Sequence, residues 1–174
     1  MSSLPSQTVG PFFHFALAAN AALGCMAGPQ ARGERVLLRF TLLDGEGKPV
    51  PDGMIELWQA DAQGRYHAAD PAFCGFGRLA TDADGRCTFH TVRPGRVDGQ
   101  AAHISVSVFA RGLLARLSTR VYFDGDPALT EDPVLALVPA ERRPTLLARF
   151  GATAEMWDFV IHLQGDRETV FFDV

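Results

Sequence analysis

Five Asp-Gly pairs divide this chain into segments rich in β-branched and aromatic residues. Both Asp and Gly tolerate a positive φ, so an Asp-Gly pair between such segments is a strong signal for a tight hairpin turn. The pairs lie at residues 44–45, 52–53, 84–85, 98–99 and 124–125. We expect a chain interrupted in this way to fold into many short antiparallel strands.

Alternation of apolar and polar side chains supports strands in several of these segments. Successive side chains of a strand point to opposite faces, so alternation predicts a strand with one buried face. Such patterns occur at residues 36–42, 104–108, 117–123 and 157–163, and residues 54–61 read as a further strand. Two packed sheets are the natural way to bury these strands. The predicted fold class is all-β, a two-sheet β-sandwich with short helical excursions.

Two segments break the β pattern. The Ala-rich residues 12–27 can form a short helix, and residues 139–150 are predicted to form another, because their apolar residues have helical spacing and Gly151 follows as an end signal. No Gly/Ser linker, repeat or charge block divides the chain. We expect a single β-sandwich domain over residues 1–174, with residues 1–34 as an N-terminal arm and short helix.

Composition narrows the range of partners. The chain has 174 residues, of which 47% are hydrophobic and 21% charged, as is usual for a compact globular domain. The formal net charge is −4 and the arginines are scattered, so no basic footprint for nucleic acid is present. We expect no nucleic acid partner, and a small molecule or another protein instead.

The apolar run at residues 12–27 does not indicate export or membrane insertion. No Lys or Arg precedes Arg32, whereas a signal peptide begins with positive charge. The run is also too short and too polar to span a bilayer. We therefore expect a cytoplasmic protein with no membrane partner. The cysteines Cys25, Cys74 and Cys87 are far apart in the sequence and are expected to be free thiols.

Several familiar catalytic motifs are absent from the sequence. It contains no GxGxxG after a predicted strand, no GxxxxGK[ST], no GxSxG and no HExxH. The histidines show no i, i+4 metal pair; they are His14, His67, His90, His103 and His162. A self-contained catalytic triad or zinc site therefore has little support.

A set of short motifs, taken in order over nearly the whole chain, resembles the intradiol ring-cleaving dioxygenases. Each motif is weak alone, and the ordered set is specific. The motifs are SQTVGPFF (6–13), MIELWQAD (54–61), GRY (64–66), GR (77–78) before TD (81–82), TVRPG (91–95), AHI (102–104), TRVYF (119–123), FVI (159–161) and ETVFFD (168–173).

The resemblance implies an iron site whose ligands this chain mostly lacks. Iron-bearing members of the family hold Fe(III) with two tyrosines and two histidines, and hard Fe(III) favours phenolate oxygens. The family's HxH pair reads His103-Ile104-Ser105 here, and its Pro-Gly-x-Tyr motif ends in Val97. The stretch after Tyr66, which would supply the other tyrosine, contains none. Only His103 remains of the expected ligands, so we predict no metal ligands on this chain.

The two tyrosines present do not compensate for these losses. Tyr66 and Tyr122 belong to motifs that the family uses structurally, and spacing gives no reason for either to face His103. We expect His103 to be a hydrogen-bonded histidine of the core or of an interface.

Within the family, the branch that cleaves protocatechuate is built from two related chains. The β chain carries the iron and the α chain does not, and this chain resembles the α chain in its SQTxGP start, its FARG segment at 109–112 and its ETVFFD ending. The resemblance implies a hetero-oligomer with a homologous β subunit, Fe(III) on that subunit, and a small aromatic substrate cleaved with O2.

The resemblance also implies which residues of this chain bind the substrate. Thr8, Gly10 and Pro11 would lie beside the aromatic ring, and Arg111 would bind the substrate carboxylate, which a guanidinium can hold bidentately. No catalytic residue is predicted on this chain. Without the resemblance, the same residues are read as an extended arm with a turn and a solvated loop charge.

Two other functions stay open from the sequence alone. One is a non-catalytic β-sandwich module for binding or carriage that kept the fold and lost the chemistry. The other is an iron enzyme with a remodelled site, which the metal content of the purified chain would identify.

Overall fold

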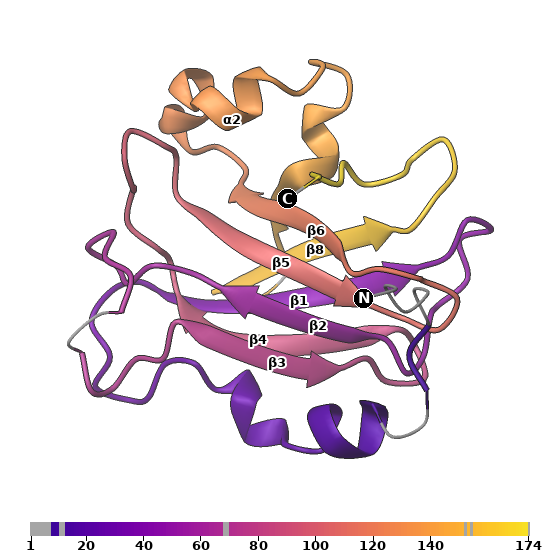
Figure 1. The fold of residues 1–174 in the computed structure, drawn as a ribbon. Helices are drawn as coiled ribbons and strands as arrows, with labels where there is room; N and C mark the ends of the chain where they lie inside the picture. Colours follow the sequence, from indigo (N-terminus) through magenta and orange to yellow (C-terminus); the bar gives the residue numbers. More distant parts are fainter. Residues whose placement is uncertain (1–7, 11–12, 68–69, 152, 154, 174) are drawn as a thin grey trace, which may run out of the picture.

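The computed structural model describes residues 8–10, 13–67, 70–151, 153 and 155–173. In this part of the chain, eight strands form one hydrogen-bonded sheet in the order β3-β2-β5-β6-β7-β8-β1-β4 (Figure 1). The strands are β1 (Arg35–Leu43), β2 (Met54–Trp58), β3 (Phe76–Ala80), β4 (Arg86–Val92), β5 (His103–Phe109), β6 (Leu117–Phe123), β7 (Leu147–Phe150) and β8 (Met156–His162).

The sheet curls until its first and last strands, β3 and β4, come close together. Met26 bridges the remaining seam: its N–H donates to the His90 carbonyl of β4 over 2.8 Å, and its own carbonyl accepts from the N–H of Cys74, just before β3, over 2.7 Å. The Met26 side chain is buried, with 2% of its surface exposed. The sheet is therefore nearly closed, with one short segment covering the gap.

The prediction of a mostly β fold with a few short helices is confirmed. Two separate sheets are not confirmed, because β6 and β7 join the two halves of the structure by parallel pairing. The pairs are Tyr122 with Leu147 and Phe123 with Ala148. This parallel link could not be expected from local alternation, which carries no information about strand partners.

The core lies inside the curled sheet and consists of the inward-facing residues of the alternating segments. In β1, Val36, Leu38, Phe40 and Leu42 are all buried, while the residues between them are half-buried. The Phe40 ring contacts the rings of Phe89 on β4 and Phe159 on β8 edge to face, each at 5.7 Å between centroids, which is a favourable aromatic geometry. The predicted strand patterns therefore give the buried face correctly.

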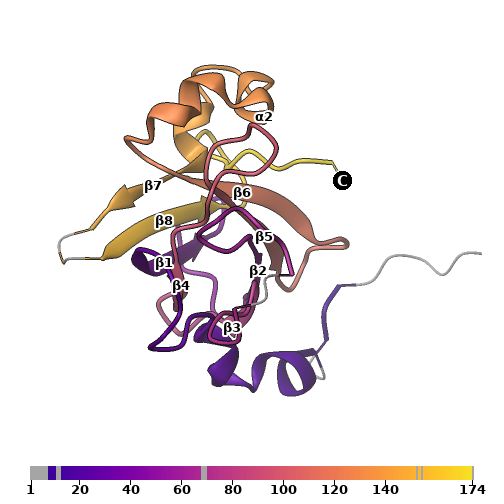
Figure 2. The same cartoon turned by 90° about the vertical axis from the view of Figure 1, so that its left-hand side faces the viewer.

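Short helical segments occur within both predicted ranges, and two more precede the second range. The described part of residues 12–27 contains η1 (His14–Ala18) and η2 (Ala21–Gly24), which lie beneath β3 in Figure 2. The second group lies between β6 and β7 and comprises η3 (Pro127–Glu131), α2 (Pro133–Ala136) and η4 (Arg143–Leu146).

The helix predicted over residues 139–150 is wrong in its second half. Only Arg143–Leu146 is helical there, and Leu147–Phe150 forms β7, which pairs with β6 on one side and β8 on the other. A short apolar run fits either a buried strand or a buried helix, so periodicity alone does not decide between them.

The Asp-Gly pairs turn the chain, but most of these turns do not join neighbouring strands. Asp98 and Gly99 have φ values of 48° and 77° and join the isolated bridge between Val97 and Gln100, as a two-residue hairpin turn requires. Gly85 has a φ of 69° and leads from β3 to β4, which are not paired with each other. No helix in the described ranges has the length and apolar character needed to cross a bilayer.

Candidate functional site

Strand β5 connects the two parts of the chain that the sequence singles out. His103, Ser105, Ser107 and Phe109 point to the outer face of the sheet, because the residues between them are buried inside. His103 lies at the start of β5, and Arg111 follows its end. At about 3.3 Å per residue, His103 and Phe109 are about 20 Å apart. The two candidate regions therefore lie at opposite ends of one strand.

At its first end, the outer face of β5 is covered by the helical segments after β6, which Figure 1 shows above β6. His103 is 5% exposed, and its Nδ1 lies 2.9 Å from the Ala101 carbonyl. Its ring centroid is 5.9 Å from that of Tyr122, which is fully buried. The Tyr122 hydroxyl donates to the buried carboxylate of Asp132 over 3.2 Å. His103 is therefore a buried, hydrogen-bonded residue, as predicted.

Burial governs the protonation of this cluster. It lowers the pKa of His103, and although the Ala101 carbonyl and Asp132 oppose this, the positive charge of Arg120 adds to it. Burial also raises the pKa of Tyr122 to about 12, against the opposing effect of Arg120. The histidine is thus held neutral and the tyrosine protonated at neutral pH.

Spacing along the chain gives no reason for either tyrosine to face His103, and the structure places Tyr122 opposite His103 on the neighbouring strand. Strand register could not be obtained from spacing along the chain. Tyr66 approaches from the other side of β5: its ring stacks on Trp58, which pairs with Ser105 from β2, with centroids 6.0 Å apart and planes at 9°. Burial raises the pKa of the Tyr66 hydroxyl.

The residues around His103 do not fit Fe(III). The position of the second family histidine is Ser105, the Tyr122 hydroxyl is a donor to Asp132, and its raised pKa disfavours the phenolate that Fe(III) prefers. Among the described residues, no group of three or more His, Cys, Asp and Glu side chains could hold a metal ion.

Arg120 brings a positive charge to this end of the sheet, which sequence reasoning missed. It lies directly opposite Ser105 on β6, and its Nη1 donates to Gln100 Oε1 over 2.6 Å. Its positive charge works to lower the pKa values of His103, Tyr122 and Tyr66, although burial raises those of the two tyrosines overall. In the sequence, Arg120 looks like one more polar residue of an alternating strand, so only strand register could reveal this position.

At the other end of β5, the structure brings together Thr8 and the loop that carries Arg111. The backbone N–H of Gly112 donates to Thr8 Oγ1 over 2.7 Å, and the ring of Phe13 lies 5.5 Å from that of Phe109. Arg111 is 71% exposed in its side chain and donates to Asp52 over 3.1 Å.

The other predicted site residues lie on the same N-terminal segment. Gly10 is exposed, a Cβ added to it would meet nothing within 4 Å, and its carbonyl accepts from the N–H of Phe13 over 3.0 Å. Pro11 lies outside the described residues. Thr8, Gly10 and Arg111 therefore share one exposed region, and their role in binding substrate stays a prediction.

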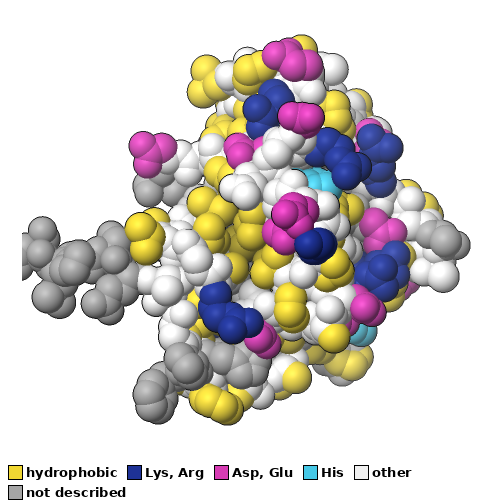
Figure 3. Space-filling view, turned by 90° about the vertical axis from the view of Figure 1, so that its right-hand side faces the viewer, with side chains coloured by type: hydrophobic (Ala, Val, Ile, Leu, Met, Phe, Trp, Pro, Cys, Tyr) yellow, Lys and Arg dark blue, Asp and Glu magenta, His cyan; other side chains and the backbone are white. Residues whose placement is uncertain are grey.

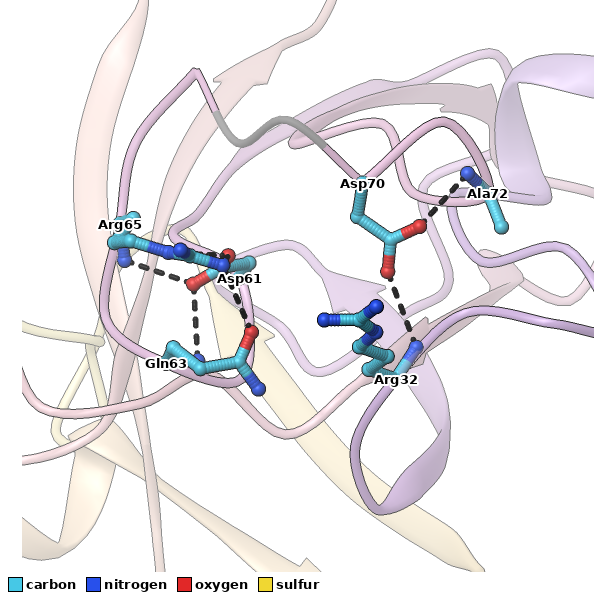
Figure 4. Close-up of polar contacts among 6 residues, drawn as sticks. All are labelled: Arg32, Asp61, Gln63, Arg65, Asp70 and Ala72. Carbon is cyan, nitrogen blue, oxygen red and sulfur yellow. Dashed lines mark hydrogen bonds and ion pairs between the residues drawn. The ribbon is translucent and has the colours of Figure 1, made fainter.

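Two carboxylates shape the loop between β2 and β3 (Figure 4). Asp61 is 3% exposed and accepts from the backbone of Gln63 and from both the backbone and the guanidinium of Arg65. Burial would raise the pKa of Asp61, but these hydrogen bonds outweigh it and lower that pKa. Asp70 accepts from the backbone N–H groups of Ala72 and Arg32, which lowers its pKa. Together these contacts hold the loop that carries Tyr66.

Charge on the surface is mixed in sign. On the face shown in Figure 3, Lys and Arg side chains lie beside Asp and Glu side chains, with apolar side chains between them. This face offers no basic stripe of the kind that nucleic acid backbones require.

The fold, the HxH position at His103 and the order of the motifs define a class, and the chain belongs to it: the family model described as Dioxygenase matches residues 9–165. The chain is 43% identical to the protocatechuate 3,4-dioxygenase alpha chain of Burkholderia cepacia, over 100% of this chain and 98% of that protein. It is 38% identical to the protocatechuate 3,4-dioxygenase beta chain of the same organism, over 83% of this chain and 66% of that protein.

A solved structure supports the same class. The dioxygenase domain of a dioxygenase and carbohydrate-binding fusion protein from Streptomyces sp. SirexAA-E superposes with a TM-score of 0.69 at 27% identity. The superposition covers 92% of this chain and 97% of that domain. The resemblance to intradiol dioxygenases stated from the sequence is therefore confirmed.

Proposed function

We propose that this chain is the iron-free α subunit of a protocatechuate 3,4-dioxygenase and works in a hetero-oligomer with a homologous β subunit. The expected reaction cleaves the ring of protocatechuate between its two hydroxyl-bearing carbons. Both atoms of O2 enter the product, 3-carboxy-cis,cis-muconate. Similarity to an alpha chain over the full length, with weaker similarity to a beta chain, supports this assignment.

The iron is proposed to be Fe(III) held by the β subunit. The residues at the corresponding place in this chain support this, because Ser105 stands where the family has a histidine and the Tyr122 hydroxyl is bound to Asp132. Fe(III) on the partner would bind the catechol oxygens. The contribution of this chain would be to shape and close the substrate pocket.

The observation that carries the proposal is the position of Arg111. It lies at the far end of β5 from His103, so a pocket formed by Arg111 and Thr8 does not belong to the iron position of this chain. An exposed guanidinium whose ion pair with Asp52 is itself exposed, on a loop that is hydrogen-bonded to Thr8, is suited to a carboxylate presented by a partner's site. Such a contact would distinguish protocatechuate from catechol, which has no carboxylate.

The test uses the assembled αβ enzyme with Arg111→Ala in this chain. We expect KM for protocatechuate to rise about tenfold to a hundredfold, as the loss of charge-assisted hydrogen bonds predicts. Iron per β subunit should stay unchanged, and so should KM for catechol. Arg86→Ala, at an exposed arginine on β4, is the matched control. Unchanged KM for protocatechuate in the Arg111 variant would contradict the assignment.

Two further sequence predictions are kept as proposals. One is that residues 1–174 act as a single domain with residues 1–34 as an arm, and the other is that the protein works in the cytoplasm.

A further inference from the structure

A pocket of about 440 Å³ lies on the outer face of β7 and β8. Side chains of the two strands that alternate with buried ones form its floor, namely Leu147, Arg149, Val160 and His162. The other lining residues come from the segment at 141–145, which includes the start of η4, and from the C-terminal segment at 166–169. The volume falls in the range of small-molecule sites.

Hydrogen bonds hold the lining of this pocket in place. Arg142 Nη2 donates to the Glu168 carbonyl over 2.9 Å, which ties the segment at 141–145 to the C-terminal segment. The N–H of Thr169 donates to the His162 carbonyl and Thr169 Oγ1 accepts from the His162 N–H, each over 3.0 Å. These contacts fix the C-terminal segment against the end of β8, so the pocket is formed before any ligand binds.

Arg142 brings a positive charge to the pocket that no carboxylate of the described residues neutralises. The residue is half-buried, and its Nη2 bonds a neutral carbonyl. Its Nε is buried and has no hydrogen-bond partner among the described residues. Buried polar groups nearly always have a partner, and removing a charge from water is costly unless an opposite charge compensates it. A bound anion would provide that compensation.

Two further arginines of the lining are free to bind an anion. Arg149 and Arg167 are exposed, and neither forms an ion pair within the part of the chain that the structure describes. The carboxylate of Asp158, which lies opposite Arg149, is instead paired with Arg39 over 2.6 Å. Burial lowers the pKa of His162 and the charge of Arg167 lowers it further, so this positive charge reaches the pocket floor.

Two carboxylates of the lining, Glu141 and Asp166, offset part of this charge. Both are exposed and solvated, whereas Arg142 is half-buried, so the inner part of the pocket keeps a positive charge. Leu147 and Val160 add an apolar surface to the floor. The pocket therefore combines guanidinium groups for an anion with an apolar patch for an organic body.

We propose that this pocket binds a small phosphomonoester, with the phosphate on Arg142, Arg149 and Arg167 and the organic body against Leu147 and Val160. A phosphomonoester carries about −1.5 to −2 charges at neutral pH and three acceptor oxygens. Several guanidinium groups, which can each bind phosphate bidentately, match this ligand better than they match a single carboxylate.

The pocket shares no residue with the proposed substrate contact at Arg111 and does not depend on the proposed function. This chain's own residues form it, so the full chain is sufficient for a first test. Affinity is expected to be modest and to fall as salt is added, because the pocket is open and part of its charge is exposed.

The experiment is a titration of the full chain with phenyl phosphate, followed through the ring proton resonances of His162. His162→Asn assigns these resonances. We expect saturable shifts with phenyl phosphate and none with benzyl alcohol, which has a similar ring without the charge. The resonances of His103, which is buried beneath the helical segments, should not move.

A pair of variants at Val160 tests the role of charge. Val160 is 44% exposed, so neither change should disturb the fold, which near-ultraviolet circular dichroism checks. Val160→Glu places a carboxylate on the pocket floor and should abolish binding, whereas Val160→Gln has the same size without the charge and should retain it. Arg142→Gln should weaken binding about tenfold, the effect of one lost charge-assisted hydrogen bond. Arg116→Gln, at an exposed arginine outside the pocket, should leave the affinity unchanged.

The absence of saturable shifts would overturn the proposal, and so would equal binding by wild type, Val160→Glu and Arg142→Gln. The titration is then repeated on the assembled αβ enzyme, where we expect binding to persist. Loss of binding in the assembly would also overturn the proposal, because the pocket would then be a contact for the β subunit. These outcomes are distinguishable from those of the proposed function, which is measured as KM in the αβ enzyme with Arg111→Ala.

Discussion

The Thr8 hydroxyl accepts a hydrogen bond of 2.7 Å from the backbone N–H of Gly112, the residue that follows Arg111. This contact joins positions 104 residues apart and holds the N-terminal segment against the loop of the proposed carboxylate contact. Removing it should loosen the wall of the proposed pocket without changing the iron content of the assembled enzyme.

Thr8→Val keeps the shape of the side chain and removes the acceptor. We expect KM for protocatechuate to rise about threefold to tenfold in the αβ enzyme, the usual effect of one lost hydrogen bond. Iron content should not change. Thr130→Val is the control, because its hydroxyl bonds only the nearby carbonyl of Pro127. An unchanged KM in the Thr8 variant would show that this hydrogen bond does not order the pocket.

In the proposed substrate contact, Asp52 would compete with the substrate carboxylate for Arg111. The two side chains are 3.1 Å apart and are 54% and 71% exposed, so their pairing contributes little to stability. Asp52→Asn should therefore leave the urea unfolding midpoint unchanged and lower KM for protocatechuate about twofold to fivefold. Asp84→Asn, at an exposed turn on the way to β4, is the control. A higher KM in Asp52→Asn would mean that Asp52 positions Arg111 for the substrate.

Asp132 connects the helical segments to the sheet. Its carboxylate is 1% exposed and accepts from the N–H groups of Val134, Leu135 and Ala101 and from the Tyr122 hydroxyl. Asp132→Ala should lower the free energy of unfolding by about 3–5 kcal/mol, because several buried donors lose their acceptor.

The control for this change is Asp44→Ala. Asp44 also accepts from two backbone N–H groups, those of Glu46 and Lys48, but in an exposed turn where water can replace it. Asp44→Ala should lower the free energy of unfolding, measured in urea, by about 1 kcal/mol. If both variants lost the same unfolding free energy, the burial of the hydrogen bonds at Asp132 would not add to their contribution to stability.

Much of the fold could be predicted because local alternation reports burial. The inward residues of β1, β5 and β8 are those that alternation assigns to the buried face. Which strands pair with each other could not be predicted in the same way. Gly85 turns the chain as an Asp-Gly signal suggests, yet the strands it joins lie at opposite edges of the sheet. Turn chemistry acts over four residues, whereas strand order depends on packing of the whole chain.

In the candidate site, too, local features could be predicted from the sequence, whereas features that depend on strand pairing could not. The loss of a histidine at Ser105 could be read directly from the sequence. The position of Tyr122 beside His103, and of Arg120 opposite Ser105, depends on the register between β5 and β6. Register is fixed by the pattern of the whole pair of strands, so it is visible only once the partners are known.

Stability should depend on pH through His103. Burial lowers its pKa; the Ala101 carbonyl opposes this, Arg120 adds to it and Asp132 opposes it. The unfolded chain therefore binds a proton first as the pH falls below about 6.5, and stability is lost from there down toward the folded-state pKa. The pKa values of Asp61 and Asp70 are also lowered in the folded chain, so these two carboxylates cause a further loss of stability as the pH falls below about 4.

His103→Asn should reduce the slope of unfolding free energy against pH between pH 7 and 5, measured by urea denaturation at each pH. The pKa of His162 is also lowered, by burial and by Arg167, so His162→Asn should remove a further part of the slope. A slope as steep as that of the wild type in the His103 variant would contradict this account.

The loop that carries Tyr66 depends on a close approach of two backbones. Gly64 has a φ of 77°, and a Cβ added to it would lie 2.1 Å from the carbonyl oxygen of Arg96. Gly47 is a matched control, because its φ is 78° and an added Cβ would meet nothing within 4 Å.

Gly47→Ala should therefore cost about 1 kcal/mol of unfolding free energy, the effect of a left-handed backbone on an L residue. Gly64→Ala carries the same cost and also forces two loops apart. It should therefore lower the free energy of unfolding by about 3 kcal/mol or more. Displacement of this loop should also disturb the stacking of Tyr66 on Trp58 and change the tryptophan fluorescence of the folded protein. Similar losses in both variants would show that the backbone angle, and not the contact with Arg96, sets the requirement for glycine at position 64.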